Sequence, residues 1–111
     1  MGRGLRTYRR AQEVSCPFII RPEAEADLAE GFDWYEERRS GLGEEFLNEV
    51  QTRLRKIEEN PLRHAVVYRN ARQALIRRFP YKVLYLFEGD RVEVLGVIHV
   101  KRQPQFWQKR V

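Results

Sequence analysis

Apolar side chains recur at helical spacing in the segment that follows residues 18–20. Spacings of 4, 4 and 3 residues place them on one helical face: Ala24, Leu28, Phe32 and Tyr35. Pro22 suits the first turn of such a helix, because the N–H that proline lacks would have no partner there. The two glycines of residues 40–43 (SGLG) are typical of a turn. The pattern therefore predicts a helix from about Pro22 to Ser40.

A second helical segment starts near Glu44. Its apolar residues again recur at helical spacing: Phe46, Leu47, Val50, Leu54 and Ile57. The segment ends at Asn60, because Pro61 pushes the residue before it out of the α region. Two amphipathic helices joined by a short glycine turn form an antiparallel hairpin. Each helix has one apolar face, so the pair needs a sheet to cover.

The other apolar runs are short and typical of strands. One run, 18–20, precedes the helices, and four follow them: 64–68, 74–76, 81–87 and 91–100. In the last run, strict alternation places one set of side chains together: Val92, Val94, Ile98 and Val100. The other face then carries Glu93, Leu95, Val97 and His99. Because both faces hold apolar residues, we expect this strand to lie inside the sheet.

This order of elements predicts an α+β domain. It consists of an N-terminal strand and an antiparallel two-helix hairpin packed on a three- to four-stranded antiparallel sheet. The basic tail with Phe106 and Trp107 suits a short C-terminal helix. Residues 1–16 show no apolar period and are interpreted as a basic flexible arm, so the domain covers 17–111.

The charge is distributed unevenly along the 111 residues, although the net charge is only +5. Residues 1–21 hold five Arg and one Glu, a balance of +4. Residues 22–60 hold five Lys or Arg and twelve Asp or Glu, a balance of −7. Residues 61–111 hold eleven basic and three acidic residues, a balance of +8. A basic half attracts nucleic acid or an acidic protein segment, although it can also be only a solvated surface.

Composition also excludes several classes of protein. No apolar run approaches the ~20 residues that a membrane helix needs. Cys16 is the only cysteine, so no internal disulfide can form. No Cys/His cluster has metal-ligand spacing, and no motif calls for a cofactor. We therefore expect a cytoplasmic protein without metal or cofactor.

Four segments in this order resemble the RelE/ParE toxin family of type II toxin–antitoxin systems, which includes plasmid stabilisation proteins. Residues 21–28 (RPEAEADL) are similar to the opening of its first helix, and residues 57–61 (IEENP) to its helix exit. Residues 81–85 (YKVLY) are similar to a Tyr-Arg-apolar-apolar-Tyr strand of the family. Residues 92–102 (VEVLGVIHVKR) are similar to its last strand. The resemblance implies the α+β fold above and a toxin that a small antitoxin neutralises.

The two subfamilies differ in their targets. RelE-like toxins cut messenger RNA on the ribosome, whereas ParE-like toxins poison DNA gyrase and are not hydrolases. Lys82 stands where the family usually has Arg, whose planar fork can hold a phosphate with two hydrogen bonds. That departure, with the long hairpin and its Trp34–Tyr35 pair, favours the ParE-like function. The alternatives are an mRNA endonuclease and a non-toxic module that only binds the antitoxin, so enzymatic activity stays open.

A RelE-like reaction would need a base for the ribose 2′-OH, cations for the phosphate charge and an acid for the leaving oxygen. The candidates are His99, Arg77, Arg102 and Lys82, with Tyr85 as a weaker one. His99 has an ordinary pKa near ~6.5, which suits acid–base catalysis. It can equally be a structural histidine at the end of the sheet. Tyr81 and Tyr85 share a face that Lys82 does not, and both are expected in the core.

The resemblance also implies a binding surface for an antitoxin, typically an acidic segment that docks on the basic sheet side. The candidates for binding this segment or nucleic acid are Arg77, Arg78, Lys101, Arg102, Lys109 and Arg110. Arg77 and Arg78 are adjacent, so a strand there would point them to opposite faces. The expected partners are thus the antitoxin and either gyrase or the ribosome with its mRNA, with no membrane.

Overall fold

A computed structural model describes residues 18–111 of the chain, so the predicted arm at 1–16 and Cys16 lie outside the described residues. The elements follow the order β1 (Phe18–Ile20), α2 (Pro22–Arg38), α3 (Leu42–Glu59), β2 (Val66–Tyr68), β3 (Ala71–Leu75), β4 (Tyr81–Glu88), β5 (Arg91–His99) and α4 (Pro104–Gln108). The predicted α+β fold is confirmed. The first strand, the hairpin and the short C-terminal helix all occur where the pattern places them.

The sheet has five strands in the order β1-β5-β4-β3-β2. Strands β2 to β5 are antiparallel to their neighbours, as predicted, whereas β1 joins the sheet parallel to β5. Phe18 pairs with Val92 and Ile20 with Val94. The N-terminal strand therefore adds a fifth, parallel member to the predicted antiparallel sheet. It also makes β5 an interior strand, which confirms the expectation from its two apolar faces.

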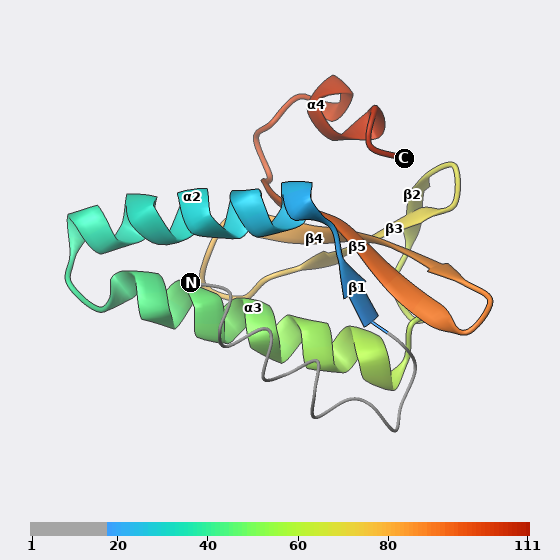
Figure 1. The fold of residues 1–111 in the computed structure, drawn as a ribbon, viewed down its shortest axis with the longest axis horizontal. Coiled ribbons are helices and arrows are strands. Elements are labelled where there is room, and N and C mark those ends of the chain that lie inside the picture. Colours follow the sequence, from blue (N-terminus) through green and yellow to red (C-terminus); the bar gives the residue numbers. More distant parts are fainter. Residues whose placement is uncertain (1–17) are drawn as a thin grey trace.

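Helices cover both faces of this sheet (Figure 1). The hairpin of α2 and α3 covers one face, and its buried residues pack with Val83, Tyr85 and Val97 of the sheet. On the other face, Trp107 of α4 packs with a smaller group of buried side chains: Ala71, Leu84, Leu86, Leu95 and Ile98. The domain thus has two apolar layers, one on each side of the sheet.

A β-bulge interrupts the pairing of β4 and β5. Leu84 pairs with Gly96, but Tyr85 pairs with Val94, so Leu95 is an extra residue on β5. The extra residue reverses the alternation. Val97 therefore faces the hairpin with Val94, and Ile98 faces α4. The predicted grouping of Ile98 with Val92 and Val94 is wrong for this reason.

Two strand boundaries also differ from the prediction. His64 lies before β2 rather than in it, and β3 starts at Ala71, three residues before the predicted run at 74–76. The actual turn uses Arg69, whose φ is +53°. Strand β3 ends at Leu75, so Arg77 and Arg78 lie in the loop before β4 and do not alternate across a strand. Arg78 has a φ of +73°, which a regular strand does not contain.

The hairpin of α2 and α3 is tight because of two small residues and one carboxylate. A Cβ at Gly31 would lie 2.8 Å from the ring of Phe46, and one at Gly43 would lie 2.9 Å from the backbone oxygen of Phe32. The Glu36 carboxylate accepts hydrogen bonds of 3.0 Å from the N–H groups of Gly41 and Gly43. The carboxylate thereby satisfies free donors at the start of α3.

Gly43→Ala is expected to lower the free energy of unfolding by about 1–2 kcal/mol. The added methyl group meets a backbone oxygen of α2, so the two helices must separate, and overpacking of this kind costs ~1–3 kcal/mol. The helix propensity of alanine offsets only part of this cost. Urea denaturation measures the change. Gly41→Asn is the control, because Gly41 has open space around its Cβ position and asparagine tolerates its φ of +90°. A more stable Gly43→Ala protein would contradict the close approach.

Candidate functional site

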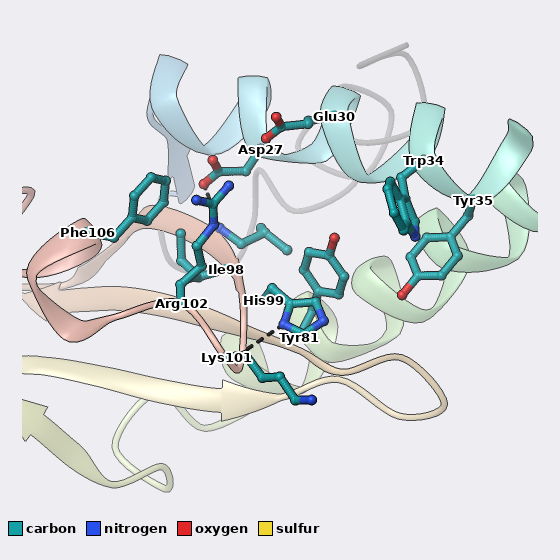
Figure 2. A pocket seen from close by; sticks show the side chains of 11 residues that line it. Asp27, Glu30, Trp34, Tyr35, Tyr81, Ile98, His99, Lys101, Arg102 and Phe106 are labelled. Atoms are coloured by element: carbon teal, nitrogen blue, oxygen red, sulfur yellow. Dashed lines mark hydrogen bonds between the residues drawn. The ribbon is translucent and has the colours of Figure 1, made fainter.

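A cavity of about 500 Å³ lies between α2 and the end of β5, and Figure 2 shows the side chains around it. This volume is in the range of ligand pockets, ~300–1,000 Å³. The cavity is lined by residues of α2, β4, β5 and the C-terminal tail: Asp27, Glu30, Trp34, Tyr35, Tyr81, Val97, Ile98, His99, Lys101, Arg102 and Phe106. Of the predicted site residues, the cavity brings together His99, Lys101 and Arg102.

Helix α2 supplies one wall of the cavity. Asp27, Glu30 and Trp34 follow at spacings of 3 and 4 residues, which puts them on one side of the helix. Trp34 is 52% exposed, and the Arg38 guanidinium lies 3.2 Å from the centroid of its ring. This wall therefore combines a large, accessible aromatic surface with carboxylates.

Two tyrosines line the cavity between this wall and His99. The ring centroids of Tyr35 and Tyr81 are 6.1 Å apart, and those of Tyr81 and His99 are 5.2 Å apart. Burial raises the pKa of the Tyr35 hydroxyl. Burial also raises the pKa of the Tyr81 hydroxyl, and the nearby Tyr35 and the Glu30 carboxylate add to the effect. Both phenols therefore keep their protons at neutral pH and act as hydrogen-bond donors.

His99 closes the turn after β5. Its Nδ1 accepts a hydrogen bond of 3.1 Å from the backbone N–H of Lys101, and its carbonyl oxygen accepts one of 3.0 Å from the N–H of Arg102. In the neutral ring the proton is then on Nε2. This geometry agrees with the structural alternative for His99, because one ring nitrogen is already used to hold the turn.

The C-terminal side of the cavity is basic. Lys101 and Arg102 are exposed, and the Arg102 guanidinium lies 4.3 Å from the ring centroid of Phe106. Carboxylates of α2 face these cations across the cavity (Figure 2). The cavity can therefore hold a group that offers both a flat apolar surface and polar atoms. The positive charges of Lys101 and Arg102 are matched in number by the carboxylates of Asp27 and Glu30, so the lining as a whole is not strongly basic.

Lys82 lies on the opposite face of the sheet from His99. Tyr81, its neighbour in β4, contacts His99 on the hairpin face, whereas the Lys82 ammonium lies 5.1 Å from the ring centroid of Trp107 on the α4 face. Burial there lowers the pKa of Lys82. Lys82 and His99 therefore cannot act on the same phosphate in this structure.

The remaining candidates for cleavage also lie apart from the cavity. Arg77 is exposed in the β3–β4 loop and does not line the cavity. Its neighbour Arg78, which was predicted only as a binding residue, forms ion pairs with Glu45, at 2.8 Å, and Glu49, at 3.8 Å. Tyr85 is fully buried, and its hydroxyl donates a hydrogen bond of 2.6 Å to the Pro61 carbonyl oxygen. Burial raises the pKa of the Tyr85 hydroxyl to about 12, so it stays protonated.

The six predicted binding residues fall into two groups. Five of them are exposed: Arg77, Arg78, Lys101, Arg102 and Lys109. Of these, Arg78 is ion-paired and the Arg102 guanidinium packs against the Phe106 ring. Arg110 differs, because its guanidinium donates hydrogen bonds of 2.7 Å to Asp27 and 3.2 Å to the Leu95 carbonyl oxygen. The two side chains are only 13% and 10% exposed. Arg110 therefore holds the C-terminus to α2, and we leave it out of the proposed binding surface.

Sequence reasoning did not identify the α2 wall of the cavity. The signal was present, since Asp27, Glu30 and Trp34 have helical spacing. However, the sequence pattern indicated only the apolar face of this helix. The face with Asp27, Glu30 and Trp34 lines a cavity only because β5 and the C-terminal tail lie against it. In the described part of the chain no group of three His, Cys, Asp or Glu side chains is placed to hold a metal ion. Over the same range no helix is long and apolar enough to cross a membrane.

Comparisons with known proteins agree with the fold. The model of a family described as the ParE toxin of the type II toxin–antitoxin system parDE matches residues 18–104. A search of curated proteins finds no match. One solved structure, titled "Chromosomal ParDE TA system from P. aeruginosa", contains a chain that is 14% identical. It superposes with a TM-score of 0.67 over 74% of this chain and 92% of that chain. Because the family model covers well over half of the sequence, the chain belongs to the ParE toxin family of type II toxin–antitoxin systems.

Proposed function

We propose that this toxin stops growth by acting on DNA gyrase and not by cutting messenger RNA. The observation that carries the proposal is the separation of the cleavage candidates. Lys82 lies across the sheet from His99, and Arg77 lies outside the cavity. A nuclease needs its base and its phosphate-binding cations within reach of one phosphodiester. Membership of the ParE family supports a target of the ParE type.

The antitoxin partner follows from the family, and we propose that it docks through an acidic segment on the basic C-terminal half. Residues 61–111 carry a balance of +8, which steers an acidic segment toward this half. Four exposed cations are proposed to contribute: Arg77, Lys101, Arg102 and Lys109. Added salt should slow the association, because these charges are open to solvent. With gyrase and the antitoxin as its partners, the toxin is expected to act in the cytoplasm.

The test is a supercoiling assay with purified gyrase, alongside a map of messenger RNA 5′ ends after induction without the antitoxin. We expect the protein to inhibit supercoiling and to produce no new 5′ ends. His99→Ala should change the inhibition by less than about twofold, whereas loss of a general acid or base lowers a rate ~10²–10⁴-fold. Lys82→Gln is the matched variant on the opposite face of the sheet.

New 5′ ends within translated codons, absent for His99→Ala, would replace the proposal with a RelE-like nuclease. In that case His99 and Arg102, which both line the cavity, would be the candidates for the catalytic residues. Normal growth, with unchanged supercoiling and intact messages, would instead indicate a module that only binds its antitoxin.

A further inference from the structure

A second group of cations lies at the other end of the hairpin, where α3 ends. It is centred on His64, in the segment between α3 and β2, and we call it the His64 site. Three guanidiniums act electrostatically on the imidazole: Arg53 of α3, Arg63 of the same segment and Arg72 of β3, which also donates a hydrogen bond of 2.7 Å to the His64 carbonyl oxygen. Burial lowers the pKa of His64, and the charges of the three arginines lower it further. Four groups that carry or can take a positive charge therefore converge from three parts of the fold.

The tautomer of His64 follows from Tyr85. The single hydroxyl proton of Tyr85 is donated to the Pro61 carbonyl oxygen at 2.6 Å. The hydroxyl oxygen, 3.3 Å from His64 Nδ1, can then only accept from that nitrogen. Nδ1 therefore carries the proton in the neutral ring. Nε2 is the nitrogen that gains a proton, and a protonated Nε2 donates to an anion.

The cations of the His64 site have no carboxylate of their own. None of the ion pairs among residues 18–111 includes Arg53, Arg63 or Arg72. The Arg72 guanidinium donates only to the carbonyl oxygens of Leu62 and His64, at 3.2 and 2.7 Å. The Nε of Arg53 is buried without a hydrogen-bond partner. A buried donor without a partner is costly, so an arriving anion would stabilise this group.

The surface beside the site is apolar. Leu62 is 61% exposed and Val66 is 51% exposed, and Val67 beside it is 38% exposed. These side chains adjoin His64 in sequence and flank it on both sides. Strand β2, to which the valines belong, is also an edge strand of the sheet. Cations next to accessible apolar side chains suit a peptide that carries acidic and apolar residues better than a sugar–phosphate backbone.

We propose that the His64 site binds a carboxylate from an acidic, partly apolar peptide segment of the antitoxin, and that His64 takes up a proton when this carboxylate binds. The inference rests on the acidic antitoxin segment proposed above and adds its docking point and its dependence on pH. The free site disfavours a proton on His64, because burial opposes the charged ring and the like charges of Arg53, Arg63 and Arg72 add to this effect. A carboxylate beside Nε2 reverses this preference, since opposite charges favour the charged form.

The linkage has a definite sign. The pKa of His64 is lowered from the ordinary value of 6.5 in the free protein, so at pH 7 the ring is mostly neutral. When the bound carboxylate raises this pKa, binding consumes a proton. Affinity therefore rises as the pH falls through the region around 6.5, by at most about tenfold per pH unit for one proton. The charged groups that act on the imidazole are Arg53, Arg63 and Arg72, and the hydroxyl in contact with it is that of Tyr85, whose pKa burial raises to about 12.

The experiment is an NMR pH titration of the imidazole C–H signals in the full chain, with and without a hexaglutamate peptide. The chain contains only two histidines, so His99 serves as an internal reference. We expect hexaglutamate to raise the pKa of His64 by about one unit and to leave His99 unchanged. Arg63→Gln and Arg53→Gln should each reduce the shift at least threefold. Arg91→Gln, which removes an exposed cation from the β4–β5 turn, should preserve the shift.

Three results would overturn the proposal. The first is no shift of His64, and the second is an equal shift of both histidines, which would indicate screening by bulk charge. The third is a larger shift with a thymidine oligonucleotide of the same charge, which would assign the site to phosphodiesters. The titration requires neither gyrase nor toxicity. Its failure therefore leaves the gyrase proposal intact, and a negative supercoiling assay leaves the His64 site intact.

Discussion

Phe46→Ala is expected to lower the free energy of unfolding by about 3–5 kcal/mol, the range found for large aromatic side chains removed from cores. Phe46 is fully buried. Its ring centroid lies 5.3 Å from that of Tyr35, 5.4 Å from that of Phe79 and 5.0 Å from that of Tyr81. The two helices already approach closely at Gly43, where an added Cβ would lie 2.9 Å from the Phe32 backbone oxygen, so they have little room to move together and fill the space. The cavity left by the substitution therefore stays open.

Urea denaturation at constant m value measures this loss. Phe46→Leu is the control, because it keeps most of the volume and should cost less than half as much. The substitution should also loosen the functional cavity, since Tyr35 and Tyr81 line it and rest on this ring. A loss below about 1 kcal/mol for Phe46→Ala would show that the aromatic cluster repacks, which would contradict the expectation that the space left by the ring stays open.

Asp27→Ala is expected to cost about 3 kcal/mol of stability, because it leaves the buried Arg110 guanidinium without its counter-charge. The carboxylate also accepts a hydrogen bond of 3.0 Å from the Val97 N–H, just after the bulge. One side chain thus connects α2, β5 and the end of the chain. Thermal and urea unfolding of the variant should agree on the loss.

The matched comparison is the double variant Asp27→Ala/Arg110→Met. Removing both charges should recover part of the stability, since no unpaired buried charge remains. Arg39→Ala serves as the exposed control, because the Arg39–Glu45 pair is 59% and 36% exposed and such pairs contribute at most ~1 kcal/mol. Equal losses for Asp27→Ala and Arg39→Ala would contradict a buried, structural ion pair.

Local patterns predicted the elements of the fold well. Helix α2 begins at Pro22 as expected, and α3 begins at Leu42, two residues before Glu44. Both are long and have one apolar face, so their periodicity identifies them. Non-local features were beyond this reasoning. The parallel pairing of β1 with β5 depends on how the hairpin carries the chain across the sheet. The bulge at Leu95 depends on how β5 pairs with β4. A sequence pattern that assumes strict alternation of side chains along β5 cannot predict it.

The candidate site was predicted in part for the same reason. His99, Lys101 and Arg102 lie close together because they are close in sequence, and the structure brings them to one cavity. The position of Lys82 across the sheet required the register of β4 against β5. In the sequence, Arg110 cannot be distinguished from the other basic residues of the tail. In the structure, it lies against Asp27, which is 83 residues earlier in the chain. A charge in a terminal segment does not reveal whether it is paired.

The parallel pairing of β1 with β5 sets the order in which this protein can fold as it is synthesised. The strand that β1 needs is made after both helices and three other strands. The ion pair of Asp27 forms even later, because its partner Arg110 is synthesised 83 residues after it. On the ribosome the hairpin therefore emerges with its apolar face uncovered, and the native sheet assembles only after β5 has been synthesised. For a growth inhibitor this delay is an interval in which an incomplete chain lacks the native surface of the toxin.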